Sequence, residues 1–240
     1  MGIDKIKVGD VQKWLNTLPV SKSTQGDIAT LLLMCFRWAE GEDLIAVNPL
    51  RKLKKPACES RGTKAMISPA DHLKLMGAAT PALRSILLFL HETGCRPSEA
   101  TRLTATNIDF ANHVIILHEH KTDHTGKPRL IVLTPTIREL LSELVAVNPN
   151  GPLMRNARGG SWTKNSLGLA FRRACKIANV NAIAYGYRHT YATDALASGV
   201  PDATVAALLG HSSTTMLHKH YSHISSRTDV LRNAALKVRG

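Results

Sequence analysis

The stretch LLGHSSTTMLHKHYSHI (208–224) ends an apolar run with glycine and histidine and places a tyrosine ten positions after that histidine. Its apolar spacing predicts one helix over 202–209 and a second over 213–220. Two stretches further upstream, TGCRPSEATRL (93–103) and YGYRHTYAT (185–193), carry arginines among helical segments. Arginine can bind phosphate through paired, charge-assisted hydrogen bonds and tyrosine can act as a nucleophile. Taken singly, each is more often a surface or packing residue.

The chain around these stretches is expected to be mainly helical. One helix is predicted to begin at Ser68-Pro69-Ala70-Asp71, where Ser68 suits the N-cap and Pro69 the first helical position. Apolar side chains at helical spacing predict a second helix that ends at Gly94 and a third that begins at Thr134-Pro135. Further helices are expected near 163–178, 188–198 and 227–238.

Three short strands are expected between the helices that end at Gly94 and begin at Pro135. They are NIDF (107–110), HVIIL (113–117) and RLIVL (129–133), with turns at Ala111-Asn112 and at DHTGK (123–127). The predicted fold class is therefore mainly α with a small antiparallel β-sheet.

The N-terminal residues 1–57 are predicted to form a separate helical domain, followed by a basic linker at 58–65 and a second domain at 66–240. Apolar side chains form one helical stripe through Trp14 and Leu15 and another that includes Leu31, Cys35 and Phe36. Ser23 can cap the second of these helices and Gly41 can end it. The linker either lies along phosphates or is a solvated loop, since charge pattern alone fits both.

The charge of the chain indicates a polyanionic partner. Its 240 residues include 31 Lys and Arg against 18 Asp and Glu, which gives a formal net charge of +13. Nucleic acid is the commonest partner of such a surface, and a basic protein without a nucleic-acid role is the alternative. Charge therefore indicates a class of partner and leaves the reaction open.

Other features exclude several classes of protein. No apolar run reaches the roughly 20 residues that span a bilayer, and the start MGIDKIKVGD lacks a signal-peptide core, so we expect a cytoplasmic protein without a membrane partner. The four cysteines form no CxxC pair and are expected to be reduced and mostly buried. The histidine clusters 118/120/124 and 218/220/223 match no familiar zinc spacing, so no metal and no cofactor are expected.

Together, the three stretches quoted above resemble the signature boxes of the tyrosine recombinases, or phage integrase family, in order, spacing and wording. The resemblance covers nearly all of residues 66–240 and extends upstream, where FRWAEGEDLIAVNPL (36–50) is similar to the end of that family's core-binding domain. It implies a helical, partial core-binding domain at 1–57 and an α+β catalytic domain at 66–240. It also implies a site-specific recombinase that acts through a 3′-phosphotyrosyl intermediate in DNA integration or in the movement of mobile elements.

The resemblance assigns a role to each site residue. It makes Tyr221 the nucleophile, Arg96 and Arg188 the phosphate-binding arginines, and Glu99 a supporting acid. His211 is the third-box histidine, and Lys121 is the hairpin lysine, with Lys127 as a competitor. Tyr185 stands where the family usually has histidine.

Elementary chemistry agrees with these roles. Two guanidinium groups can neutralise the non-bridging oxygens of a phosphodiester without metal. A phenol, whose pKa in water is about 10, can attack phosphorus and later leave again, which conserves the bond for rejoining. An ammonium at Lys121 can protonate the departing 5′ oxygen, while the imidazole of His211 donates a hydrogen bond to the phosphate.

Tyr185 is the one departure from the family pattern. A phenol can donate a hydrogen bond, but it is a far poorer base near neutral pH than imidazole. His189 is not expected to replace the missing histidine, because one step along a helix from Arg188 turns a side chain by roughly 100°.

The resemblance also implies how the protein assembles. Double-stranded DNA is the expected partner, bound by a homotetramer whose C-terminal helices are exchanged between subunits. The segment RTDVLRNAALKVRG (227–240) is the expected exchanged helix, and packing on its own domain is the alternative. Two other functions stay open: a catalytically impaired DNA-binding relative, which Tyr185 suggests, and a relaxase similar to type IB topoisomerases.

Overall fold

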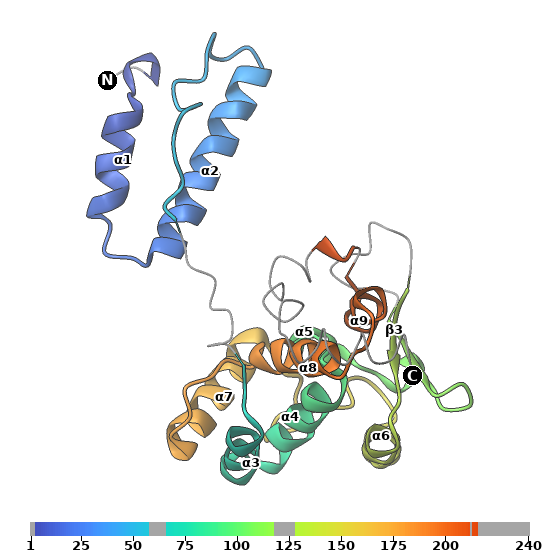
Figure 1. Ribbon diagram of the computed structural model, residues 1–240. Helices are drawn as coiled ribbons and strands as arrows, with labels where there is room; N and C mark the ends of the chain where they lie inside the picture. Colours follow the sequence, from blue (N-terminus) through green and yellow to red (C-terminus); the bar gives the residue numbers. More distant parts are fainter. Residues whose placement is uncertain (1–2, 58–65, 118–127, 212, 216–240) are drawn as a thin grey trace, which may run out of the picture. The chain divides into compact units, whose positions relative to one another are not determined.

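The computed structural model describes residues 3–57, 66–117, 128–211 and 213–215 of the chain (Figure 1). Its contacts divide the chain into two compact units, Met1–Ser60 and Arg61–Gly240. Most described elements are α-helices, and three short strands form one antiparallel sheet. The expected fold class is confirmed. The domain boundaries placed at the ends of the 58–65 linker stay a prediction, because that segment lies outside the described residues.

The first unit contains a 3-10 turn (Ile3–Lys5) and the helices α1 (Val8–Thr17) and α2 (Lys22–Gly41). The N-cap of α2 is Ser21, whose hydroxyl accepts a hydrogen bond from the backbone N–H of Thr24 at 3.2 Å. The prediction of Ser23 as the cap was wrong, because Ser23 already lies in the first helical turn. A small core joins the two helices to the segment that follows them, and its buried members are Leu15, Ala29, Phe36, Leu50 and Leu53.

The apolar stripes predicted for these helices are only partly buried. Leu31 is 65% exposed, Trp14 is 47% exposed, and Cys35 is also exposed, contrary to the predictions for all three. Among the described residues, α2 packs on α1 and on the segment that contains Leu50, which together cover a narrow face of the helix. The rest of each predicted stripe therefore contacts solvent.

The second unit is organised around α4 (Pro81–Thr93), whose Leu83, Ile86, Leu87, Phe89 and Leu90 are all buried. Around it lie α3 (Pro69–Ala78), α5 (Pro97–Arg102), α6 (Pro135–Val147), α7 (Lys164–Ala178), α8 (Gly186–Ala197) and α9 (Asp202–Leu209). The helices expected near 163–178, 188–198 and 202–209 are confirmed within two residues. Those expected at 213–220 and 227–238 fall almost entirely outside the described residues.

Helix starts in this unit follow the predicted capping chemistry. The Ser68 hydroxyl accepts from the N–H of Asp71 at 3.1 Å, and Pro69 occupies the first turn of α3. The Thr134 hydroxyl accepts from the N–H of Ile137 at 3.4 Å at the start of α6. These contacts satisfy backbone donors that have no partner inside the helix.

The sheet follows a 3-10 turn (Ala105–Asn107) and has the order β1 (Ile108–Asp109), β2 (Val114–Leu117) and β3 (Arg129–Val132), antiparallel throughout. All three predicted strands are present, although each is shorter than predicted. Ile115 pairs with Ile131 in register, and both side chains are buried on the inner face. The predicted turn at 123–127 lies outside the described residues.

A second, smaller apolar cluster joins α8 to α9 through the buried Ala192, Val205, Ala206 and Leu209. Figure 1 shows α9 between α8 and β3, and α9 contacts both of them. The end of α9 therefore lies where the sheet and the helices α4, α5 and α8 approach one another.

Candidate functional site

Arg96 is positioned by the turn that ends α4. Gly94 has φ 58°, and a Cβ atom there would lie 2.6 Å from the ring of Tyr191, so only glycine fits both the left-handed conformation and the close approach. Arg96 then forms the N-cap of α5, with Pro97 in its first turn. The turn fixes the direction in which the guanidinium leaves the backbone.

Glu99 holds Arg96 from two sides. One carboxylate oxygen accepts from the Arg96 backbone N–H at 2.8 Å, and the other pairs with Arg96 Nη1 at 2.6 Å. Glu99 is only 7% exposed, and burial strengthens a charge-assisted hydrogen bond because little water competes for either partner. This carboxylate therefore orients the guanidinium of Arg96.

Arg188 projects from α8 and is only 2% exposed. Its Nη1 donates to the carbonyl of Gly94 at 3.1 Å and its Nη2 donates to the carbonyl of Leu209 at 2.6 Å. Burial, and then the positive charge of Arg96, lower the pKa of the Arg188 guanidinium from its usual value. The two predicted phosphate-binding arginines are distant in sequence, but they are close enough for the charge of Arg96 to act on Arg188.

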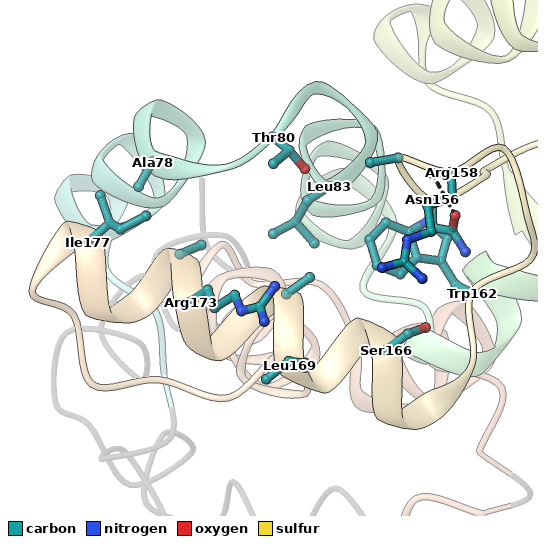
Figure 2. A pocket seen from close by; sticks show the side chains of 13 residues that line it. Ala78, Thr80, Leu83, Asn156, Arg158, Trp162, Ser166, Leu169, Arg173 and Ile177 are labelled. Carbon is teal, nitrogen blue, oxygen red and sulfur yellow. Dashed lines mark hydrogen bonds between the residues drawn. The ribbon is translucent and has the colours of Figure 1, made fainter.

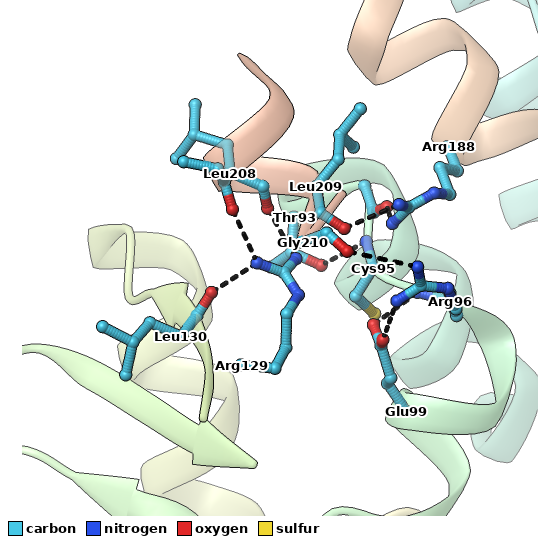
Figure 3. Close-up of polar contacts among 12 residues, drawn as sticks. Thr93, Cys95, Arg96, Glu99, Arg129, Leu130, Arg188, Leu208, Leu209 and Gly210 are labelled. Carbon is cyan, nitrogen blue, oxygen red and sulfur yellow. Dashed lines mark hydrogen bonds and ion pairs between the residues drawn. The ribbon is translucent and has the colours of Figure 1, made fainter. Parts of the chain in front are cut away.

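His211 follows directly on the end of α9. Gly210 ends the helix with φ 64°, and the backbone N–H of His211 donates to the carbonyl of Ala206 at 2.9 Å. Arg96 Nη2 donates to the carbonyl of Gly210 at 3.3 Å. Arg96 and Arg188 therefore meet at the end of α9, and Glu99 is bound to Arg96 (Figure 3). His211, from the third stretch, is the next residue after this end.

A third arginine at this turn was missed by the sequence analysis. Arg129 begins β3, is 3% exposed, and donates to the carbonyls of Ala207 at 3.1 Å and Leu208 at 2.5 Å. The alternation in RLIVL was a signal that could have found it, because Arg129 falls on the same face as the buried Ile131 and Leu133. A charged side chain on the buried face of a strand is almost always paired with a polar or oppositely charged group.

Tyr185 lies at the N-terminus of α8 and is 40% exposed. Its ring meets the ring of His189 edge to face, with centroids 5.3 Å apart. His189 was not expected to replace the missing histidine, because it is one helical step from Arg188. It is four residues from Tyr185, however, so these two side chains share one face of the helix.

Other residues named from the sequence are not placed. Tyr221, Lys121 and Lys127 lie outside the described residues, as do the two histidine clusters considered for metal. Within the described part of the chain, no group of three or more His, Cys, Asp or Glu side chains could hold a metal ion. Likewise, no helix among those residues is long and apolar enough to cross a membrane.

Two of the described cysteines, Cys95 and Cys175, are buried thiols. Cys95 is fully buried beside Arg96, and burial raises the pKa of its thiol to about 12. The thiolate is the reactive form, so Cys95 is not a competing nucleophile. Cys175 is buried as well, and burial also raises the pKa of its thiol.

The chain also has a pocket away from this turn. A hollow of about 490 Å³ lies between α7 and the residues around Thr80 and Leu83, with Arg158, Arg173 and Trp162 in its wall (Figure 2). Among the described residues that line it, none is a carboxylate, histidine, cysteine or tyrosine. The hollow therefore lacks a nucleophile paired with a base, and the turn after α9 is the better candidate for chemistry.

Comparisons with known proteins point the same way. Residues 66–227 match the phage integrase family. The chain is 29% identical over 199 residues to tyrosine recombinase XerD of Mycobacterium tuberculosis, covering 75% of this chain and 63% of that protein. It is 26% identical over 235 residues to tyrosine recombinase XerC of Bacillus subtilis, covering 89% of this chain and 74% of the relative. The chain thus spans less than two thirds of the length of the first of these relatives.

Solved structures share the fold. The Tn1549 transposon integrase in complex with a circular intermediate DNA superimposes with a TM-score of 0.80 at 21% identity, over 98% of this chain and 86% of that one. A lambda integrase tetramer bound to a Holliday junction gives a TM-score of 0.73 at 18% identity, over 89% and 66% of the two chains. At such identities the likeness concerns the fold alone. With the family match over residues 66–227, however, it leaves one conclusion: this chain belongs to the phage integrase family.

Proposed function

We propose that the protein is a site-specific DNA recombinase that cleaves and rejoins DNA strands through a covalent bond between Tyr221 and a 3′ phosphate. The observation that carries the proposal is the convergence of Arg96, Arg188 and His211 at the turn after α9, with Glu99 paired to Arg96. Two cationic donors and an imidazole beside them form a site for an anionic oxygen.

The proposed reaction forms one phosphoester bond for each one that it breaks. Tyr221 Oη gives its proton to solvent and attacks phosphorus, and the phosphotyrosyl ester forms as the bond to the 5′ oxygen breaks. Lys121 then gives the departing 5′ oxygen a proton, and a free 5′ hydroxyl later reverses the step. No water enters the exchange, and the energy of the phosphodiester stays in the protein–DNA ester.

The arginines can serve this step while keeping their present contacts. A guanidinium has five N–H donors, and the contacts of Arg188 to Gly94 and Leu209 use two of them. Donors fixed in advance stabilise the charge that develops on phosphate oxygens without reorganising during the reaction. We infer that Arg96 and Arg188 bind the two non-bridging oxygens and that His211 donates to one of them, without metal.

The proposed partner is double-stranded DNA, bound by a homotetramer in the cytoplasm. The net charge of +13 supports a DNA partner, and the lambda integrase relative assembles as a tetramer on a Holliday junction. In this proposal residues 1–57 clamp the duplex, the 58–65 linker follows the phosphates, and residues 227–240 are exchanged between subunits.

The direct test uses a nicked suicide substrate carrying a candidate recombination site, with EDTA present. A covalent protein–DNA adduct attached through a 3′ phosphate is expected, and its DNA sequence would define the cleavage site. Tight DNA binding without any adduct would favour the impaired DNA-binding relative that Tyr185 suggests. An adduct that forms only after a metal is restored would contradict the metal-free mechanism.

A further inference from the structure

The carboxyl end of α9 is held by three arginines rather than two. The carbonyls of Ala207 and Leu208 accept from Arg129, that of Leu209 accepts from Arg188, and that of Gly210 accepts from Arg96. The last carbonyls of a helix have no partner within the helix and carry the negative end of its dipole, so cations are favoured there. Four consecutive carbonyls are thereby fixed just before His211 (Figure 3).

Arg129 is as buried as Arg188 and makes one more contact to a backbone carbonyl. Its side chain is buried, and a third contact joins Nη1 to the carbonyl of Leu130 at 2.5 Å. Burial lowers the pKa of its guanidinium to about 10, which still leaves it charged at neutral pH. Arg129 is therefore a buried cation whose guanidinium donates to three backbone carbonyls, two of them in the turn before His211.

The fit between Arg129 and the turn is close. A Cβ atom on Gly210 would lie 2.4 Å from Cδ and 2.6 Å from Nε of Arg129. Gly210 itself needs its positive φ to reverse the chain into His211. The turn can therefore approach β3 this closely because Arg129 binds its carbonyls and because Gly210 has no side chain to collide with Arg129.

We propose that Arg129 is a positioning residue for DNA cleavage, which fixes the turn of residues 207–210 and through it the imidazole of His211. The inference rests on the function proposed above, in which His211 contacts the phosphate. Arg129 binds two adjacent carbonyls as a fork, and a displacement of about 1 Å in a catalytic group can slow a reaction by about 100-fold. Losing the fork should slow cleavage without weakening DNA binding.

The first test compares Arg129→Lys with Arg155→Lys. Lysine keeps the charge but cannot hold two carbonyls with a planar fork. Arg155 also donates to two backbone carbonyls, those of Pro152 and Asn150, so it controls for the general loss of such a contact. Single-turnover adduct formation should be about tenfold slower or more in Arg129→Lys and unchanged in Arg155→Lys, with DNA affinity within about twofold in both.

The second test changes Gly210, which contacts the Arg129 side chain. It does not depend on whether Arg129→Lys folds. Gly210→Ala forces Arg129 to shift, whereas Gly159→Ala has a similar positive φ of 77° and meets nothing within 4 Å. Both alanines carry similar backbone strain, so only Gly210→Ala should slow cleavage beyond what thermal unfolding explains.

A double-mutant cycle separates positioning from stability. If Arg129 acts through His211, adding Arg129→Lys to His211→Ala should slow cleavage much less than adding it to the wild type. A full multiplicative effect in the His211→Ala background would overturn the proposal, as would Arg129→Lys cleavage within about twofold of wild type. Absence of any adduct with the wild-type chain would instead refute the proposed function.

Discussion

The contact between Glu99 and Arg96 lets the site be tested at a single carboxylate. Glu99→Gln keeps an oxygen for the Arg96 backbone N–H but removes the charge that holds its guanidinium. We expect adduct formation to be about tenfold slower, equivalent to about 1.4 kcal/mol, with DNA affinity little changed. The measurement is a single-turnover rate at saturating DNA, at a temperature where circular dichroism shows the variant folded.

The control for this substitution is Glu92→Gln, which changes a half-buried carboxylate of α4 that contacts His91 and Thr134 instead of Arg96. Its cleavage rate should match that of the wild type. Equal rates for the Glu99 and Glu92 variants would show that the pairing with Arg96 is structural only.

Tyr185 can be tested as a substitute for the family's histidine. If its hydroxyl holds the phosphate or the nucleophile, Tyr185→Phe should slow cleavage, because one polar contact is lost with almost no change in shape. Tyr185→His should then be no faster than the wild type. We expect this result from single-turnover rates on one suicide substrate; an unaffected Phe variant beside a faster His variant would mean that Tyr185 is a defect.

His189 lies beside Tyr185 on the same face of α8. Its ring contacts Tyr185, so an imidazole stands one helical turn from the position where the family carries it. The spacing that predicts this contact runs from residue 185 to residue 189, whereas the sequence prediction was based on the single step from residue 188.

Among the elements, α3, α4 and α8 meet at a polar contact that makes stability depend on pH. His72 stacks on His91 with ring centroids 4.0 Å apart, and its Nδ1 lies 3.0 Å from the Tyr187 hydroxyl. Burial, and then the charge of His91, lower the pKa of His72, while Glu92 raises it. The folded state thus binds a proton at His72 less readily than the unfolded state does.

The sign of the effect follows from that difference. Below an unfolded pKa of about 6.5, the unfolded state takes up more protons, so the free energy of unfolding falls as pH drops from about 7 to 5. His72→Gln should reduce this fall. The control is His113→Asn, since His113 is exposed at φ 54° and asparagine tolerates that conformation. Urea unfolding across this range would contradict the account if both variants kept the wild-type slope.

Patterns within single elements predicted the fold well, and contacts between elements explain what they missed. The strands around Ile115 and the helix starts at Ser68 and Thr134 follow from alternation and capping, which are local. Leu31 was placed wrongly because periodicity identifies an apolar face without showing what covers it. Arg129 was missed because its partners are carbonyls about 80 residues away, where no side-chain motif marks them.

For the molecule as a whole, the family resemblance predicted one site that contains Arg96, Glu99, Arg188 and His211. The structure adds the backbone of α9, which binds the arginines and orders the turn before His211.

In the proposed function, the hydroxyl of Tyr221 cuts DNA. The Tyr221→Phe variant, assayed on the nicked suicide substrate, tests this role. The substitution removes one oxygen and no charge, so DNA affinity should stay within about twofold of wild type while covalent adduct falls below detection. Peptide mapping of the wild-type adduct should place the attached nucleotide on Tyr221. A covalent adduct that persists in Tyr221→Phe, or one that maps to another residue, would contradict the account.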